Sequence, residues 1–246
     1  MYKNPLGFEK LSKLLRSFAI PSIISMLVSS LYNIVDQIFI GQGVGYLGNA
    51  ATNVAFPLTT ISVAIALLVG IGSASRFSLY IGAKENDKAA CVVGNGFVSM
   101  LILSALYVIL VLTFLTPLLY AFGSTDQIFP YAYSYTQITT WGVPFLITTN
   151  VMSNMIRADG SPKYSMACMV LGAVINTILD PIFIFVFDMG VEGAAWATVI
   201  GQIASALMAL RYLKLFKNVN LVRLDFRFSF HEFLSTSAIG ISSCVN

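Results

Sequence analysis

Two aspartates, Asp36 and Asp180, lie inside long runs of apolar residues, and they are the side chains best placed to do chemistry. An ionisable group within a membrane span is rare and costly, so each marks a functional site by default. The alternative for each is a structural carboxylate that pairs with a polar neighbour. The two aspartates are therefore the first candidates for a cation-binding site.

The stretch NTILDPIFIF gathers several oxygen atoms around the second aspartate. Asn176 precedes Asp180 by four residues, so their side chains share one helical face. Pro181 has no N–H to give to the carbonyl of Thr177 and crowds it, so that carbonyl needs another partner. Hard cations take carboxylate, amide and carbonyl oxygens as ligands, so this stretch predicts a site for Na+ and for no other metal.

Both aspartates are expected at the same depth in the membrane. Asp36 follows Arg16 by 20 residues, and Asp180 follows Lys163 by 17. At about 1.5 Å per residue, both lie roughly 25–30 Å above these inner charges. Thr198 reaches a similar level from the span that follows. The spacing therefore predicts one site built from three helices.

The 17–40 span has a polar stripe within an arc of about 100°. Its members are Ser22, Ser25, Ser29, Tyr32, Asn33 and Asp36. Such a stripe faces either a cavity or a closely packed helix, since small residues also serve packing in membranes. The aspartate at its end favours a cavity. The 131–156 span is also unusually polar, and Pro144 is expected to kink it.

The composition places these residues in an all-α integral membrane protein. The chain of 246 residues is 57% hydrophobic and only 10% charged, with a mean hydropathy of +0.81. Soluble domains carry about a quarter charged residues. We predict a bundle of six transmembrane helices, at about 17–40, 54–75, 91–116, 131–156, 164–187 and 193–213.

The basic residues alternate between the two sides of the predicted bundle. All 14 Lys and Arg lie in the N-terminal segment, in alternate loops, or at the end of the sixth span and just after it. The three opposite loops, 41–53, 117–130 and 188–192, contain none. The positive-inside rule then predicts a cytoplasmic N-terminus. We expect an integral plasma (inner) membrane protein.

A seventh apolar stretch begins at Phe233 and is too short to cross a bilayer. We therefore expect a first lobe over 1–228 and the truncated start of a second over 229–246, in a fragment of a longer protein.

The remaining motifs do not predict catalysis. The glycines of GQGVGYLG follow a membrane span and not a strand, so they do not indicate a dinucleotide site. GIGSAS, at 70–75, indicates close helix packing. The sequence has one histidine, His231, and contains no Ser/His/Asp set, HExxH motif or P-loop. We expect no enzyme, no cofactor and no nucleic-acid partner.

Several blocks, in order along the chain, resemble multidrug and toxic compound extrusion (MATE) transporters. They are FAIPS followed by VDQIFIG, VGIGSASRFSLYIGAKENDKA, IRADGSPK, and NTILDPIFIF followed by GVEGAAWAT. The resemblance covers essentially the whole chain. It implies one six-helix lobe of a twelve-helix protein with a central cavity. Such proteins export organic, often cationic, drugs or metabolites in exchange for Na+ or H+.

The resemblance also implies roles for individual residues. It assigns the cation site to Asp36, Asn176, Asp180 and Thr198. It makes Pro21 the bending point of the first helix. Three further residues are expected to line the pocket: Tyr135, Met169 and Asn33. The implied partners are a small organic substrate, membrane lipid and the missing C-terminal lobe.

Two other functions are weighed against this one. A lipid-linked oligosaccharide flippase of the same superfamily would need basic residues inside the spans to hold a pyrophosphate, and none is found there. A non-transporting membrane protein would show either rings of charge along a pore or a nucleophile beside a base. Neither pattern is visible in the sequence.

Overall fold

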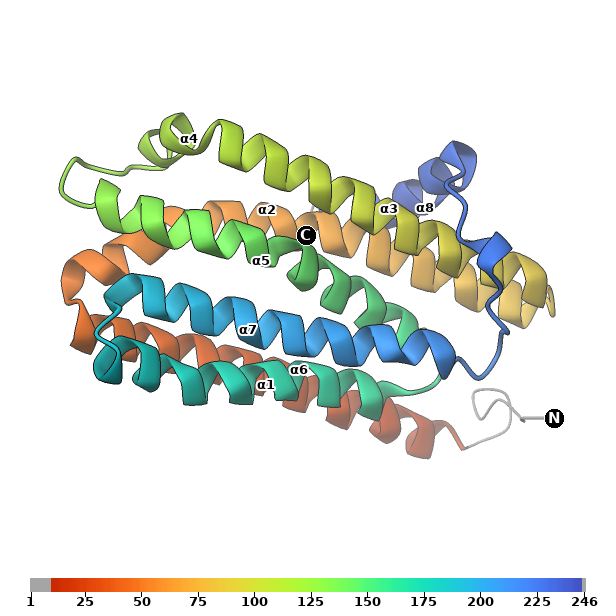
Figure 1. Ribbon diagram of the computed structural model, residues 1–246. Coiled ribbons are helices and arrows are strands. Elements are labelled where there is room, and N and C mark those ends of the chain that lie inside the picture. The colour runs from red at the N-terminus through yellow and green to blue at the C-terminus, as the bar shows by residue number, and fades with distance from the viewer. Residues whose placement is uncertain (1–9, 245–246) are drawn as a thin grey trace.

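The computed structural model describes residues 10–244, and every regular element within that range is a helix. Figure 1 shows the long helices lying side by side along one axis. They are α1 (Leu11–Gly43), α2 (Tyr46–Gly82), α3 (Asn86–Thr113), α5 (Phe129–Ala158), α6 (Pro162–Pro181) and α7 (Gly190–Arg211). The shorter elements are α4 (Leu115–Ala121), η2 (Ile182–Val186), η3 (Tyr212–Lys214), η4 (Arg223–Asp225) and α8 (Phe230–Cys244). The predicted all-α membrane fold is confirmed.

Among residues 10–244, five helices are long and apolar enough to cross a membrane. They begin at Leu11, Tyr46, Asn86, Pro162 and Gly190. The predicted 131–156 span corresponds to α5, which has 30 residues but is more polar. α5 packs along α2 and α7 and also contacts α3 and α6. Its polar residues are therefore tolerated because protein, and not lipid, surrounds much of this helix.

Two predicted boundaries are wrong. α2 begins at Tyr46, although the second span was predicted from 54, so most of the predicted 41–53 loop is helical. The third span, predicted to run to 116, divides into α3 and the short α4. The division falls where Pro117 has no N–H to offer the carbonyl of Thr113, four residues earlier.

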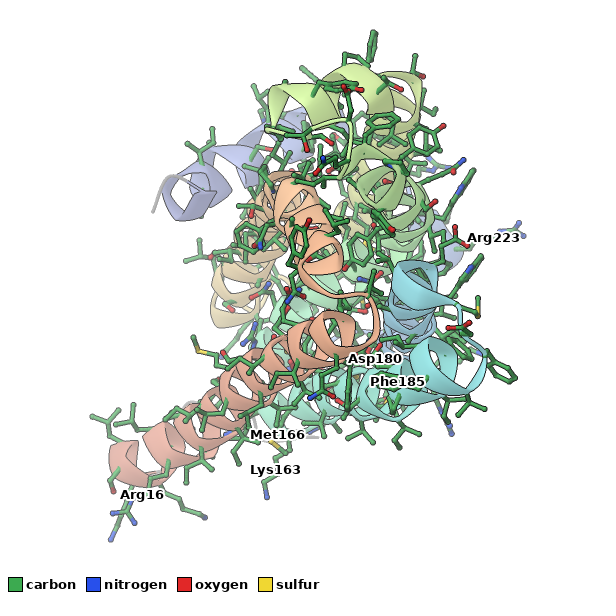
Figure 2. All side chains as sticks on the ribbon, turned by 90° about the vertical axis from the view of Figure 1, so that its left-hand side faces the viewer. Arg16, Lys163, Met166, Asp180, Phe185 and Arg223 are labelled. Carbon is green, nitrogen blue, oxygen red and sulfur yellow. The ribbon has the colours of Figure 1, made fainter. Side chains whose placement is uncertain are left out.

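The apolar core lies between α2, α3 and α5. Its fully buried members include Phe77, Met100, Ile147 and Met152. By contrast, only 11% of the apolar window of α1 is buried, and its main contacts are with α6. Figure 2 shows α1 running outward from the rest of the bundle. The first helix is therefore the most loosely held of the long elements.

Glycines on α2 allow two close helix contacts. A Cβ at Gly70 would lie 3.1 Å from the Cα of Val151 on α5, and one at Gly72 would overlap the carbonyl of Thr236 on α8. A Cβ at Gly240 of α8 would likewise overlap the carbonyl of Leu68. The GIGSAS stretch thus serves close packing, as the sequence predicted.

Candidate functional site

Two glycines bring α6 and α7 into close contact. A Cβ at Gly172 would overlap Oγ of Ser205, and one at Gly201 would lie 2.7 Å from the carbonyl oxygen of Gly172. Real side chains do not approach so closely, so both positions need glycine. The Ser205 hydroxyl also donates to the carbonyl of Cys168, at 2.9 Å. This contact fixes the distance between the polar residues further along the two helices.

Asn176 joins α6 and α7 through its side-chain amide. Its Nδ2 donates to Oδ1 of Asp180 at 3.2 Å and to Oγ1 of Thr198 at 3.3 Å. Asn176 is 3% exposed and Asp180 is 0% exposed. Both amide N–H groups are therefore used inside the cluster.

Asp36 reaches the same cluster from α1 and is 7% exposed. Its carboxyl group is close enough to that of Asp180 for direct interaction. Figure 2 shows Asp180 inside the bundle beside α1, far from the labelled Arg16 and Lys163. Within residues 10–244, neither carboxylate pairs with a Lys or Arg side chain. The two acidic groups thus meet without a compensating positive charge.

Three buried oxygens of the cluster accept no hydrogen bond from the described residues. They are Oδ1 of Asp36, Oδ1 of Asn176 and Oδ2 of Asp180. Buried polar atoms without partners are costly, and buried charges are normally paired. A bound cation or proton would satisfy these oxygens.

The chain leaves α6 through a π-helical turn, η2. α6 ends at Pro181, and the N–H of Phe187 then donates to the carbonyl of Ile182, five residues earlier, at 3.0 Å. Single π-turns are frequent at functional sites. Here the turn places Ile184 against Gly43, at the end of α1, where a Cβ would overlap it.

An aromatic contact strengthens the same junction. The rings of Phe39 and Phe185 meet edge to face, with centroids 6.2 Å apart. The C-terminal end of α1 is therefore held to η2, although much of the surface of α1 is exposed.

A cavity of about 440 Å³ opens next to the carboxylate cluster. Residues of α1, α2, α5, α6 and α7 line it, Thr198 among them. On α1 the lining ends at Asn33, three residues before Asp36, and on α6 it ends at Asn176, four residues before Asp180. Both carboxylates thus lie about one helical turn beyond the cavity, toward the C-terminal ends of α1 and α6.

Of the three residues predicted to line the pocket, Met169 and Asn33 do so. Tyr135 does not line it. Its ring packs against the small apolar cluster of Ile40, Ile184 and Ala194, and it lies close enough to Asp36 and Asp180 to interact with both carboxylates. Its place in the pocket of the cation site therefore stays a prediction.

Pro21 lies within α1, which continues as one α-helix from Leu11 to Gly43. The carbonyl of Pro21 accepts a bond from the Ser25 hydroxyl at 2.8 Å. Pro21 leaves the carbonyl four residues before it, at Ser17, without its helical donor. The helix is thus weakened locally but not interrupted.

Asp159 is a buried carboxylate that the sequence analysis did not single out. It is 1% exposed and follows the end of α5. It accepts bonds from the Tyr212 hydroxyl at 2.8 Å, from the backbone N–H of Lys217 at 2.8 Å, and from the Asn218 side chain at 2.8 Å. A loop carboxylate gives no periodic signal, so its burial could not be read from spacing.

Long apolar helices around a cavity, with a buried carboxylate pair beside it, are features of polytopic membrane transporters. The MatE family model matches residues 21–182. The chain belongs to the MatE family.

Individual relatives agree with this assignment. The multidrug export protein MepA of Staphylococcus aureus (strain NCTC 8325 / PS 47) is 29% identical over 222 residues, covering 89% of this chain and 49% of MepA. The chain thus spans about half the length of the curated relatives it matches. These relatives are named as export proteins and not as enzymes.

Solved structures show the same fold. A multidrug resistance MATE family transporter of the MOP superfamily, in an outward-facing conformation, matches with a TM-score of 0.91 and 28% identity, over 100% of this chain and 55% of that one. A MATE structure in the bent conformation matches with a TM-score of 0.87 and 29% identity, over 95% of this chain and 52% of that one.

Proposed function

We propose that this chain forms one lobe of a secondary antiporter that exports organic, often cationic, drugs or metabolites in exchange for Na+ or H+. The observation that carries the proposal is the buried pair Asp36 and Asp180, with unsatisfied oxygens beside a polar cavity. An uncompensated carboxylate pair inside a membrane protein needs a cation. The chain belongs to a family whose relatives are named as multidrug export proteins, and this supports organic drugs or metabolites as substrates.

Either ion suits the cluster chemically. Na+ would find carboxylate oxygens from Asp36 and Asp180, the amide oxygen of Asn176 and the hydroxyl of Thr198, which are the oxygen ligands that hard cations take. A proton would allow the two carboxyl groups to share one hydrogen bond, since like charges at close range cannot both remain ionised at low cost. The coupling ion is therefore Na+ or H+, and no further cofactor is required.

The cation would act on α1. α1 packs mainly against α6, its C-terminal end also touches η2, and little of its apolar surface is buried. The interaction of Asp36 with Asp180 therefore contributes to its position. Neutralising the pair removes their repulsion and draws α1 toward α6. We propose that α1 then bends near Pro21, that the cavity narrows, and that the substrate leaves.

The proposal extends to the whole transporter. We propose that residues 1–228 make the first lobe and that the segment from 229 begins the second, in a plasma membrane with the N-terminus in the cytoplasm. The cavity lining includes no Lys or Arg among the residues that the structure describes. A flippase for pyrophosphate-linked lipids needs such groups, so the cavity favours export of organic compounds.

Transport by the full product of the gene tests the proposal. The protein is reconstituted in liposomes, and efflux of ethidium, a fluorescent organic cation, is driven by an inward Na+ gradient or an inward H+ gradient. We expect efflux under at least one gradient, and strong loss of efflux in Asp36→Asn and Asp180→Asn. Undiminished efflux in both variants under the same gradient would refute the assigned site.

A further inference from the structure

Two amide side chains present their oxygens to the cavity. Nδ2 of Asn33 donates to the carbonyl of Ser29 at 2.8 Å, and Nδ2 of Asn150 donates to the carbonyl of Leu146 at 2.9 Å. A carbonyl can only accept, so the amino end of each amide must face it. The amide oxygen is then the end left for a ligand. Both residues line the cavity.

Two hydroxyl groups of the lining behave in the same way. Thr60 donates to the carbonyl of Phe56 at 3.0 Å, and Ser205 donates to the carbonyl of Cys168 at 2.9 Å. A hydroxyl has one hydrogen, so once that hydrogen is donated only lone pairs remain. The wall thus offers four acceptors whose own hydrogens are already engaged by the backbone.

Gln202 is oriented in the opposite way. Its Oε1 is buried without a hydrogen-bond partner and lies against Gly142 of α5, where a Cβ would overlap it. The amino end of this amide is therefore the one left for the cavity. Gln202 thus adds one amide donor, and the hydroxyl groups of Tyr32, Thr59 and Thr149 also line the cavity.

The charge of the cavity and its apolar lining restrict the range of ligands further. None of the described lining residues is Lys, Arg, Asp or Glu, and the carboxylate pair lies one turn away. Apolar contact comes from Phe56, Val63, Leu146 and Met169. The fitting ligand has an apolar body and a positive group that donates several hydrogen bonds.

We propose that the cavity selects cations bearing several N–H donors, such as protonated primary amines, over permanently quaternary ammonium ions with the same apolar body. The proposal deepens, and rests on, the proposed export function, because it specifies the substrate class of the same cavity. A quaternary ion can use only the aromatic faces of Tyr32 and Phe56. An ammonium with N–H groups uses those faces and the acceptors together.

A matched pair of probes tests this selection. Binding of 4-phenylbutylammonium and of its N,N,N-trimethyl analogue is measured by equilibrium dialysis against the chain in detergent, with empty micelles as blank. We expect the primary ammonium to bind at least about tenfold more tightly, since hydrogen bonds involving a charged group are among the stronger ones. Equal binding, tighter binding of the quaternary ion, or binding of neither would overturn the proposal.

A second test compares binding of the two probes before and after one hydrogen-bond acceptor of the cavity wall is removed. Asn150→Leu removes a lining oxygen, and Asn53→Leu is the matched control because Asn53 is exposed and its amide donates only to Asn49. We expect Asn150→Leu to weaken binding of the primary ammonium about tenfold and to leave the quaternary ion unchanged. Equal weakening of both probes would overturn the proposal and indicate a structural effect.

The two proposals fail separately. If the full gene product exports both probes equally well, the export function stands and the selection is wrong. If binding shows the selection but no organic compound is exported under either gradient, the selection stands and the export function is wrong.

Discussion

Asn176 is the residue on which the candidate cation site depends most. Its side-chain amide donates one hydrogen bond to Asp180 and one to Thr198, and its oxygen accepts no hydrogen bond within the cluster. The sequence predicted that Asn176 and Asp180 share a face, because they are four residues apart. It could not predict that a single amide would join two helices, since that depends on the side-chain rotamer.

Replacing Asn176 by Leu should both destabilise the protein and disturb the site. Asp180 and Thr198 would each lose a partner, which costs about 1–3 kcal/mol when the group stays buried. Thermal unfolding in detergent measures the loss, and Asn53→Leu on the exposed face of α2 is the control. A melting temperature equal to that of the control would argue against the amide bridge.

Among the elements, α6 and α7 act as one unit because Gly172 and Gly201 let them touch. The sequence offered no repeat or motif that would pair these two glycines, so their contact is a result of the structure. Their approach sets the 3.3 Å bond between Asn176 and Thr198. The proposed cation site is thus built on a helix pair, and Asp36 is brought to it by α1.

Gly201→Leu should separate these two helices. The added side chain would meet the Gly172 carbonyl and the Asn176 Cβ, and overpacking of this kind costs about 1–3 kcal/mol. Gly82→Leu is the matched control because a Cβ there meets nothing within 4 Å. Stability and cation affinity should fall together in Gly201→Leu only. A fall in stability with unchanged cation affinity would contradict the link between the glycine contact and the site.

Asp159 plays a structural role at the opposite end of the same helices. It ties the end of α5 to the segment after α7 through donors from Tyr212, Lys217 and Asn218. Asp159→Asn keeps the shape but turns an amino group toward these donors, so we expect a loss of about 1–3 kcal/mol.

Hydrogen exchange measures this effect locally. The amides of Lys217 and Asn218 should exchange faster in Asp159→Asn, and Asp188→Asn, in an exposed loop, should leave them unchanged. Unaltered exchange in Asp159→Asn would show that these bonds do not hold the segment.

For the whole molecule, the length of the apolar runs predicted six spans, and five of the described helices are long and apolar enough to cross a membrane. The charge pattern predicted only their orientation, which stays a prediction. The helix ends were less predictable, because Pro117 and the π-turn after Pro181 act through local backbone geometry. The place of Tyr135 in the pocket stays a prediction, because it depends on how α5 rotates about its axis, which a polar sequence does not fix.

The orientation in the membrane is a further prediction at this scale. In a background where Cys91 is replaced by Ser, a cysteine at Lys84 should react with an impermeant maleimide only in inside-out vesicles. A cysteine at Asp188 should react only in intact cells. Both positions are exposed, so burial of the cysteine would not account for a failure of the maleimide to react. Labelling of position 84 in intact cells would reverse the proposed topology.

Cation binding by the carboxylate pair is the central claim, and titration calorimetry tests it most directly. Na+ is added to the protein in weakly buffered detergent, and proton release is followed in parallel. We predict saturable Na+ binding, or a titratable proton, in the wild type and in Asp188→Asn, and neither in Asp36→Asn or Asp180→Asn. Unchanged cation binding in the last two variants would contradict the account.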